Sequence, residues 1–242
     1  MKIFLAGAGG VVGRRLTPLL RAAGHDVVGT TRRAENAAAI AALGATPSVV
    51  DVFDAAALKR AMLAAAPQVV IHQLTDLPDS ANIVQLGLAL PRNARLREEG
   101  TRNLIAAACA VGAARLVAQS IAFIYADGPK PQLESDALVS GEGILPAAIS
   151  ARGVRSLESQ VTGTPGIDGI VLRYGRLYGS GTWTEIAKGE APLHVDAAAQ
   201  AALLAVERGT PGIYNIAEDD GAVSVEKAKR ELGFDAQFRI MT

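Results

Sequence analysis

Short apolar runs alternate with longer segments of mixed polarity along most of the chain. Each apolar run is four to seven residues long, and most are rich in branched side chains, which is typical of strands buried on both faces of a sheet. The runs cover residues 2–6, 26–30, 46–52, 69–72, 115–119, 169–173 and 212–216. The segments between them have the length of helices, and several end at a glycine. They cover residues 11–23, 34–43, 55–66, 96–111, 150–161, 196–207 and 225–232.

This alternation predicts an α/β fold, a Rossmann-type doubly wound parallel sheet covered by helices on both faces. Two stretches interrupt it, residues 77–93 without a clear period and residues 127–146 with three of the eleven prolines. Both follow predicted strand ends, where such folds carry their binding loops. We therefore expect a single domain over residues 1–242 with a reduced C-terminal substrate-binding region. The substrate region is expected mainly from residues 76–95, 127–149 and 177–242.

A glycine triplet, Gly7, Gly10 and Gly13, separates the first strand from the first helix. Glycine there allows a tight turn, close approach of a pyrophosphate to the backbone, and contact between helix and strand. The helix N-terminus, with Val11 and Val12, then presents free N–H groups to the phosphates. Such a triplet can also be an ordinary flexible turn. Its position between a strand and a helix favours a dinucleotide site.

The end of the second strand indicates which nicotinamide cofactor the chain prefers. An acidic residue there would bind the adenosine ribose, but this chain has Thr31, Arg32 and Arg33. Hydroxyl and guanidinium groups suit a 2′-phosphate, so we expect NADP, with NAD as the alternative. The arginines can instead be a solvated start of the next helix. Asp51 and Val52, at the end of the third strand, are expected to meet the adenine.

Composition excludes several other classes of protein. The chain has 24 basic and 24 acidic residues, and this balance gives no basic field for nucleic acid or an anionic membrane. The single cysteine, Cys109, and the absence of a long apolar run predict a cytoplasmic protein that does not enter a membrane. His25, His72 and His194 lack the spacing of metal ligands, so we expect no metal site.

Several further segments resemble the extended and atypical short-chain dehydrogenase/reductase superfamily, the NAD-dependent epimerase/dehydratase group. These segments are residues 70–74 (Val-Ile-His-Gln-Leu), 99–104 (Glu-Gly-Thr-Arg-Asn-Leu), 172–179 (Leu-Arg-Tyr-Gly-Arg-Leu-Tyr-Gly) and 194–196 (His-Val-Asp). The resemblance covers nearly the whole chain. It implies a cofactor site lined by Gly7, Gly10, Gly13, Arg32, Asp51, Gln73 and Leu74. We also expect Ser120 and Tyr174, at the ends of two strands, to contact the cofactor, although Ser120 can instead cap the backbone.

The chain departs from this family at the catalytic groups. The family's tyrosine and lysine stand four residues apart on one helix, where the ammonium lowers the pKa of the phenol. None of the four tyrosines here has a lysine four residues later; they are Tyr125, Tyr174, Tyr178 and Tyr214. Alignment of the helix puts Ser150 at the tyrosine position and Val154 at the lysine position. The serine position falls on Ile121.

These departures leave two functions open, and no catalytic residue is assigned. The first is an NAD(P)-dependent oxidoreductase or epimerase that acts on a small substrate. The second is a catalytically inactive NADP-binding sensor or regulatory protein. We expect Tyr125, Tyr178 and Trp183 near the substrate, although Trp183 can equally be a packing lid. Only residues 180–193 lie where a nucleotide sugar would need a large cap.

A homodimer is expected through the helices at residues 96–111 and 150–161. In the family that this chain resembles, two such helices from each protomer often pair. The first helix here carries apolar residues on more than one face. An alanine-rich monomer is the alternative.

Overall fold

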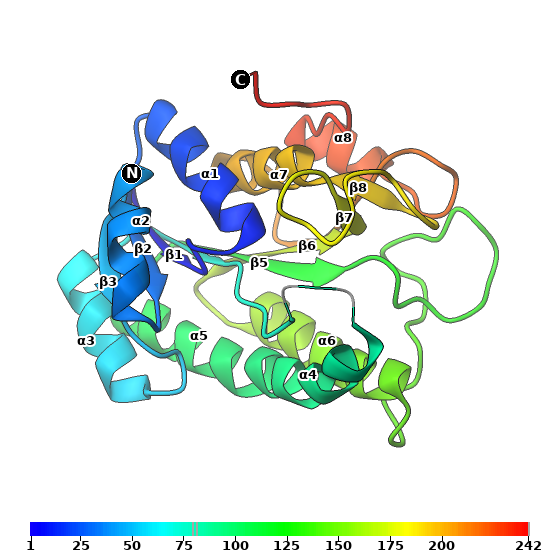
Figure 1. Ribbon diagram of the computed structural model, residues 1–242, viewed down its shortest axis with the longest axis horizontal. Coiled ribbons are helices and arrows are strands. Elements are labelled where there is room, and N and C mark those ends of the chain that lie inside the picture. Colours follow the sequence, from blue (N-terminus) through cyan, green and yellow to red (C-terminus); the bar gives the residue numbers. More distant parts are fainter. Residues whose placement is uncertain (79, 81, 242) are drawn as a thin grey trace.

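A seven-stranded parallel sheet forms the centre of the molecule (Figure 1). The computed structural model describes residues 1–78, 80 and 82–241. Residues 79, 81 and 242, which fall within the expected substrate region, lie outside the described residues. The strands are β1 (Lys2–Ala6), β2 (Asp26–Thr31), β3 (Thr46–Val49), β4 (Val69–His72), β5 (Arg115–Ile121), β6 (Asp168–Tyr174) and β9 (Gly212–Ile216). Their order, β3-β2-β1-β4-β5-β6-β9, confirms the predicted Rossmann-type sheet.

Helices cover both faces of this sheet, as the continuous apolar strands predicted. They are α1 (Val11–Ala22), α2 (Ala37–Ala42), α3 (Ala55–Ala65), α4 (Ile83–Arg95), α5 (Thr101–Ala110), α6 (Pro146–Gly163), α7 (Val195–Glu207) and α8 (Glu226–Leu232). On β1, Ile3 and Leu5 pack with α1 and α7, whereas Phe4 and Ala6 face α3 and α5. Figure 1 shows α1, α7 and α8 on one side of the sheet and α4, α5 and α6 on the other.

The stretch at residues 77–93, expected as an irregular binding loop, instead contains most of helix α4. The Asn82 side chain caps this helix, since its Oδ1 accepts a hydrogen bond from the N–H of Val84 at 3.0 Å. The sequence conceals the helix because large apolar side chains on its first turns point outward. These side chains are Ile83, Val84 and Leu88, exposed by 85%, 68% and 67%.

Helix α4 ends at Arg95, but the chain stays helical into the predicted helix at residues 96–111. A π-helical turn, η2 (Leu96–Gly100), joins α4 directly to α5. Such a turn holds one residue more than an α-helical turn, so it rotates the residues that follow it about the helix axis. The long helical rod therefore presents different faces before and after η2.

Three smaller differences from the predicted elements lie near the sheet's carboxyl edge. Strand β3 ends at Val49, so Asp51 and Val52 lie in the connection that follows it. Helix α6 begins at Pro146, whose fixed φ suits a first helical position. A separate parallel pair, β7 (Arg176–Tyr178) and β8 (Pro192–His194), was not predicted because each strand has only three residues.

Candidate functional site

The glycine loop after β1 is packed so closely that side chains cannot replace two of its glycines. Gly7 has φ of +95°, and a Cβ there would lie 2.7 Å from the carbonyl oxygen of Gln73. A Cβ on Gly13 would lie 2.2 Å from the carbonyl oxygen of Gly7. The N–H of Gly7 donates to Thr30 Oγ1 at 3.4 Å, which ties the loop to β2. These contacts account for the glycine spacing read from the sequence.

Helix α1 begins at this loop with the features of an anion-binding site. Gly10 is its N-cap, no side chain caps the first turn, and that turn holds no acidic residue. The N–H groups of Val11, Val12 and Gly13 precede the first intrahelical bonds, so they are free for a ligand. Together with the helix dipole they favour negative charge. The residues present therefore fit the pyrophosphate of a dinucleotide.

A pocket opens beside the glycine loop, at the carboxyl ends of the first four strands. It brings together five residues predicted to bind the cofactor, namely Thr31, Arg32, Asp51, Val52 and Leu74. Leu96 of the π-helical turn closes the pocket from the side of the helices. The pocket wall is mainly apolar with polar groups at its rim, which suits an adenosine.

Two arginines share one carboxylate at the rim of this pocket. Arg92 Nε lies 3.2 Å from Asp76 Oδ2, and Arg32 Nη2 lies 3.8 Å from Asp76 Oδ1. The Arg32 side chain is 56% exposed. Thr31 Oγ1 accepts from the N–H of Arg33 at 3.1 Å, so its hydroxyl shapes the turn after β2. With Asp51, which also lines the pocket, the rim carries two carboxylates and two guanidinium groups.

Gln73 and Tyr174 meet across the carboxyl edge of the sheet. Gln73 Nε2 donates to the Tyr174 hydroxyl at 3.1 Å, and that hydroxyl donates to the carbonyl oxygen of Ala198 at 3.1 Å. Complete burial raises the pKa of Tyr174 well above its usual value. The buried Gln73 Oε1 accepts no hydrogen bond from the described residues. It is therefore an acceptor left for a ligand or a bound water.

The aligned catalytic positions hold no phenol or ammonium group. Val154 is fully buried in an apolar cluster with Ala122 and Ala151. Ser150 is half-buried in the second turn of α6, and Ile121 is half-buried at the end of β5. Apolar side chains therefore occupy the two positions at which the family has its lysine and its serine.

Ser120 and Tyr125 belong to a buried polar network below the ends of β5 and β6. Ser120 Oγ donates to Glu158 Oε1 at 2.7 Å. Arg173 donates two hydrogen bonds to the same carboxylate, at 2.8 and 2.7 Å. It also donates to the Tyr125 hydroxyl at 2.7 Å. Tyr125 in turn donates to Asn215 Oδ1 at 2.7 Å. Burial raises the pKa of Tyr125, so its phenol stays neutral.

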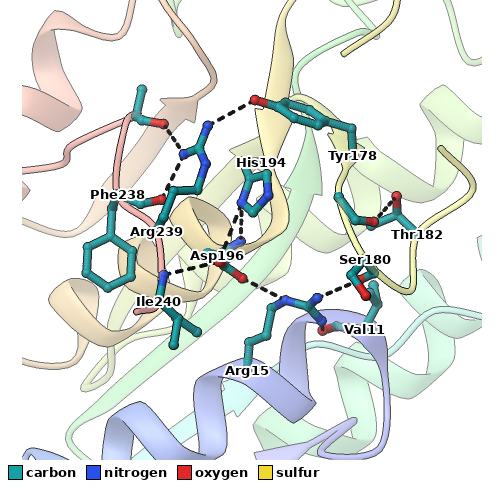
Figure 2. Close-up of polar contacts among 12 residues, drawn as sticks. Val11, Arg15, Tyr178, Ser180, Thr182, His194, Asp196, Phe238, Arg239 and Ile240 are labelled. Carbon is teal, nitrogen blue, oxygen red and sulfur yellow. Dashed lines mark hydrogen bonds and ion pairs between the residues drawn. The ribbon is translucent and has the colours of Figure 1, made fainter. Parts of the chain in front are cut away.

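Tyr178 lies in a second polar cluster, on the side of α1 and α7 (Figure 2). Arg239 Nη2 donates to its hydroxyl at 3.0 Å. His194 caps α7, since its Nδ1 accepts from the N–H of Asp196 at 3.2 Å, while Asp196 Oδ1 accepts from Arg15 Nε at 2.7 Å. The N–H of Ile240 donates to Asp196 Oδ2 at 3.1 Å, and this bond holds the C-terminal tail against the start of α7 (Figure 2). The Tyr178 hydroxyl is thus engaged within the protein.

Trp183 bridges two loops at the carboxyl edge of the sheet. Its Nε1 donates to the carbonyl oxygen of Pro78 at 2.9 Å, which joins the β7–β8 connection to the segment after β4. The side chain remains 43% exposed. A Cβ on Gly181, in the same connection, would lie 3.6 Å from Val11 Cγ2 at the start of α1. The β7–β8 connection therefore extends over the glycine loop.

Sequence reasoning missed three charged groups that the structure brings to this edge: Asp76, Arg92 and Glu158. The only signal for Glu158 is its spacing, since residues 150, 154 and 158 share one face of α6. Asp76 and Arg92 gave no signal because the helix that carries Arg92 was not predicted.

Comparison with known proteins decides the family. The model of the NAD dependent epimerase/dehydratase family matches residues 3–192. The chain belongs to this family. It is also 37% identical, over 253 aligned positions, to a 3-diazoavenalumate denitrifying reductase from Streptomyces sp, covering 93% of this chain and 79% of that protein. The resemblance read from the sequence is thereby confirmed.

Solved structures agree on the fold. UDP-glucose 4-epimerase of Thermotoga maritima, crystallised with UDP-glucose, has a TM-score of 0.78 at 18% identity, covering 99% of this chain and 94% of that one. UDP-glucose 4-epimerase of Bifidobacterium longum, in complex with NAD⁺ and UDP, has a TM-score of 0.76 at 13% identity, with 99% and 94% covered. At these identities the likeness concerns the fold.

Two further findings concern metals and membranes. Among the described residues, no group of three or more His, Cys, Asp or Glu side chains is arranged to hold a metal ion. No helix in the described part of the chain is long and apolar enough to cross a membrane.

Proposed function

We propose that this protein is a nicotinamide-dependent reductase whose substrate accepts a hydride without needing a proton from the protein. The observation that carries the proposal is the contrast between two halves of the site. The glycine loop and its helix N-terminus fit a dinucleotide, whereas Val154 and Ile121 stand at positions that hold a lysine and a serine in the family. The family and the reductase relative support this combination.

The chemistry of the substrate decides whether a proton donor is needed. Reduction of a carbonyl leaves an alkoxide that must be protonated, which is the task of a general acid. A diazonium carbon differs: the hydride pair forms the new C–H bond, and the C–N bonding pair departs with N₂. This balance consumes no proton. The relative named as a denitrifying reductase acts on a diazo compound, so we propose the same class of acceptor for this chain.

In this proposal the chain's own residues bind and orient the cofactor and keep water out of the site. A reduced nicotinamide dinucleotide supplies the hydride when bound. The N–H groups of Val11 and Val12 would hold its pyrophosphate, and Asp51 and Arg32 line the pocket proposed for its adenosine. Trp183 and its connection cover the glycine loop and would limit the entry of water. The Tyr174 phenol, with its raised pKa, stays neutral and donates to the backbone instead of to a substrate.

A panel of acceptors tests the proposed function. The protein is incubated with NADPH and either 3-diazo-4-hydroxycinnamate or matched ketones and aldehydes, and NADPH oxidation is followed. We expect turnover with the diazo compound above the protein-free rate, and little with the carbonyl compounds. Faster reduction of a carbonyl compound would reveal a proton donor and refute the proposal.

We propose NADP as the preferred cofactor because the rim of the pocket carries Arg32 and no acid at Thr31. Arg32→Ala is expected to weaken NADP binding by about tenfold or more, the loss of a charge-assisted hydrogen bond, and to leave NAD binding nearly unchanged. Calorimetric titration of both cofactors measures this. Arg60→Ala, at an exposed position on α3 outside the pocket lining, is the control. Equal effects of Arg32→Ala on the two cofactors would refute the assignment.

The substrate is proposed to be small. Only the short β7–β8 connection stands where a cap for a nucleotide sugar would be needed. We expect no saturable binding of UDP-glucose at micromolar concentrations in a calorimetric titration of the NADP-loaded protein. Saturable micromolar binding would contradict this expectation.

The homodimer and the cytoplasmic location stay proposals. The described structure adds an exposed apolar surface for pairing on the first turns of α4 and at the start of α6. Ile83, Val84, Ile144 and Leu145 contribute to it, with exposures from 68% to 89%. Ile83 and Val84 begin the helical rod that continues into residues 96–111, and Ile144 and Leu145 precede α6, which contains residues 150–161.

A further inference from the structure

Arg97 is a buried cation on the π-helical turn between α4 and α5. Only 6% of it is exposed, and the turn that carries it packs against α6. π-Helical turns within α-helices occur frequently at functional sites, since they aim a side chain that a regular helix would direct elsewhere. Here the turn directs an arginine toward the interior.

Within the described residues, the Arg97 guanidinium has no hydrogen-bond or ion-pair partner. The one carboxylate that favours its charge is Glu158. That carboxylate is already engaged by Arg173 at 2.7 and 2.8 Å and by the Ser120 hydroxyl at 2.7 Å. Two buried guanidinium groups therefore share a single carboxylate, and only Arg173 contacts it.

The other neighbours of Arg97 do not balance its charge. Burial, with the nearby Arg97 charge, lowers the pKa of His72 to about 4, so this histidine is neutral at pH 7. The His72 ring is held by Thr101 Oγ1 at 3.2 Å from its Nε2. Burial also lowers the pKa of Arg97 to about 10, which leaves the guanidinium protonated at pH 7. No carboxylate of the described residues contacts the Arg97 guanidinium, so its charge is unpaired.

An uncompensated buried charge is costly, and native proteins rarely keep one without a use. A planar guanidinium with free N–H groups matches a carboxylate, which it can bind through two parallel hydrogen bonds. Arg97 also follows Leu96, which lines the pocket at the strand ends, and its charge acts on His72 at the end of β4.

We propose that Arg97 binds the carboxylate of the substrate, which makes the substrate a small organic acid. This inference rests on the proposed function, because it places the substrate beside the ends of β4 and β5. The glycine loop and the start of α1 bind the cofactor but not the substrate. Arg97 would hold the substrate's carboxylate by charge and leave its reacting carbon free.

Binding of a non-reacting acid tests the inference without any turnover. The probes are cinnamate and its neutral counterpart cinnamamide, titrated by calorimetry into the full chain without a reductant. We expect cinnamate to bind at least tenfold more tightly than cinnamamide, and Arg97→Met to abolish this difference. Arg97→Lys keeps the charge and should restore part of it. Arg102→Met, an exposed arginine on the next turn, is the control and should bind cinnamate normally.

Thermal unfolding of the unliganded variants separates ligand binding from a structural role. Arg97→Met removes an uncompensated charge, so we expect an unchanged or higher Tm. Arg173→Met breaks a formed ion pair and should lower the Tm. Equal binding of the two probes, unchanged cinnamate binding in Arg97→Met, or a Tm loss in Arg97→Met like that in Arg173→Met would each overturn the inference. Cinnamate binding without any reductase activity would refute the proposed function and leave the anion site standing.

Discussion

Glu158→Gln is expected to lower the free energy of unfolding by about 3–5 kcal/mol, the cost of leaving one partner of a buried ion pair uncompensated. Glu158 and Arg173 are 5% and 3% exposed, and two hydrogen bonds join them. Loss of the carboxylate charge would leave Arg173, and the nearby Arg97, without a counter-charge. Urea denaturation followed by circular dichroism measures the change.

A surface ion pair on the same side of the sheet is the matched control. Glu99 and Arg95 form an exposed pair at 2.7 Å on successive helical turns. Glu99→Gln should change the free energy of unfolding far less than Glu158→Gln, because water screens exposed pairs. Equal losses for Glu158→Gln and Glu99→Gln would show that the buried network does not stabilise the fold.

Gly13→Val is expected to abolish dinucleotide binding and to destabilise the chain by about 1–3 kcal/mol or more. A Cβ at this position would lie 2.2 Å from the carbonyl oxygen of Gly7 and 2.8 Å from Ala8 Cα. Both atoms belong to the backbone, so the loop itself must shift, and the N–H groups at the start of α1 move with it. Calorimetric titration with NADP and thermal unfolding measure the two effects separately.

Gly163→Ala is the control for this substitution. Gly163 ends α6, and a Cβ there would meet nothing within 4 Å. The variant should bind NADP normally and unfold at the same or a higher temperature, since alanine favours a helix over glycine. Normal NADP binding by Gly13→Val would place the dinucleotide elsewhere and contradict the proposed cofactor site.

The sheet and the glycine loop were predictable from sequence because each rests on a local pattern. Continuous apolar runs such as residues 69–72 indicate strands covered on both sides, and the order of strands and helices limits the topology. Backbone contacts require glycine at positions 7 and 13, so the glycine spacing in the sequence directly indicates the shape of this loop. The predicted residues Arg32, Asp51 and Leu74 accordingly line one pocket.

Of the long helix over α4 and α5, the sequence predicted only the part at residues 96–111. The two ends of this helix differ in which face carries the apolar side chains. Its first turns expose Ile83 and Leu88, so the apolar positions do not mark the face that packs against the protein. The π-helical turn then changes the register, and no residue type marks such a turn in a sequence. Arg97 lies between Leu96 and two glutamates, where it reads as a solvated charge. Its burial follows from the turn alone.

The polar network around Glu158 depends on contacts between distant segments. Arg173 and Tyr125 come from different strand ends, and Asn215 completes the chain of hydrogen bonds from β9. Sequence reasoning considered Tyr125 as a substrate residue or a replacement proton donor. The structure shows its hydroxyl engaged with Arg173 and Asn215, so either role would first require these bonds to break.

We propose that the chain delivers a hydride to its substrate although the family's tyrosine and lysine are absent. Isotope transfer tests it most directly. NADPH carrying deuterium at the transferable C4 position is incubated with the protein and 3-diazo-4-hydroxycinnamate, and the organic product is analysed by mass spectrometry. We expect release of N₂ and one deuterium on the carbon that bore the diazo group, well above the protein-free control. Unchanged NADPH and no deuterium in the product would contradict it and favour a cofactor-binding protein without catalytic activity.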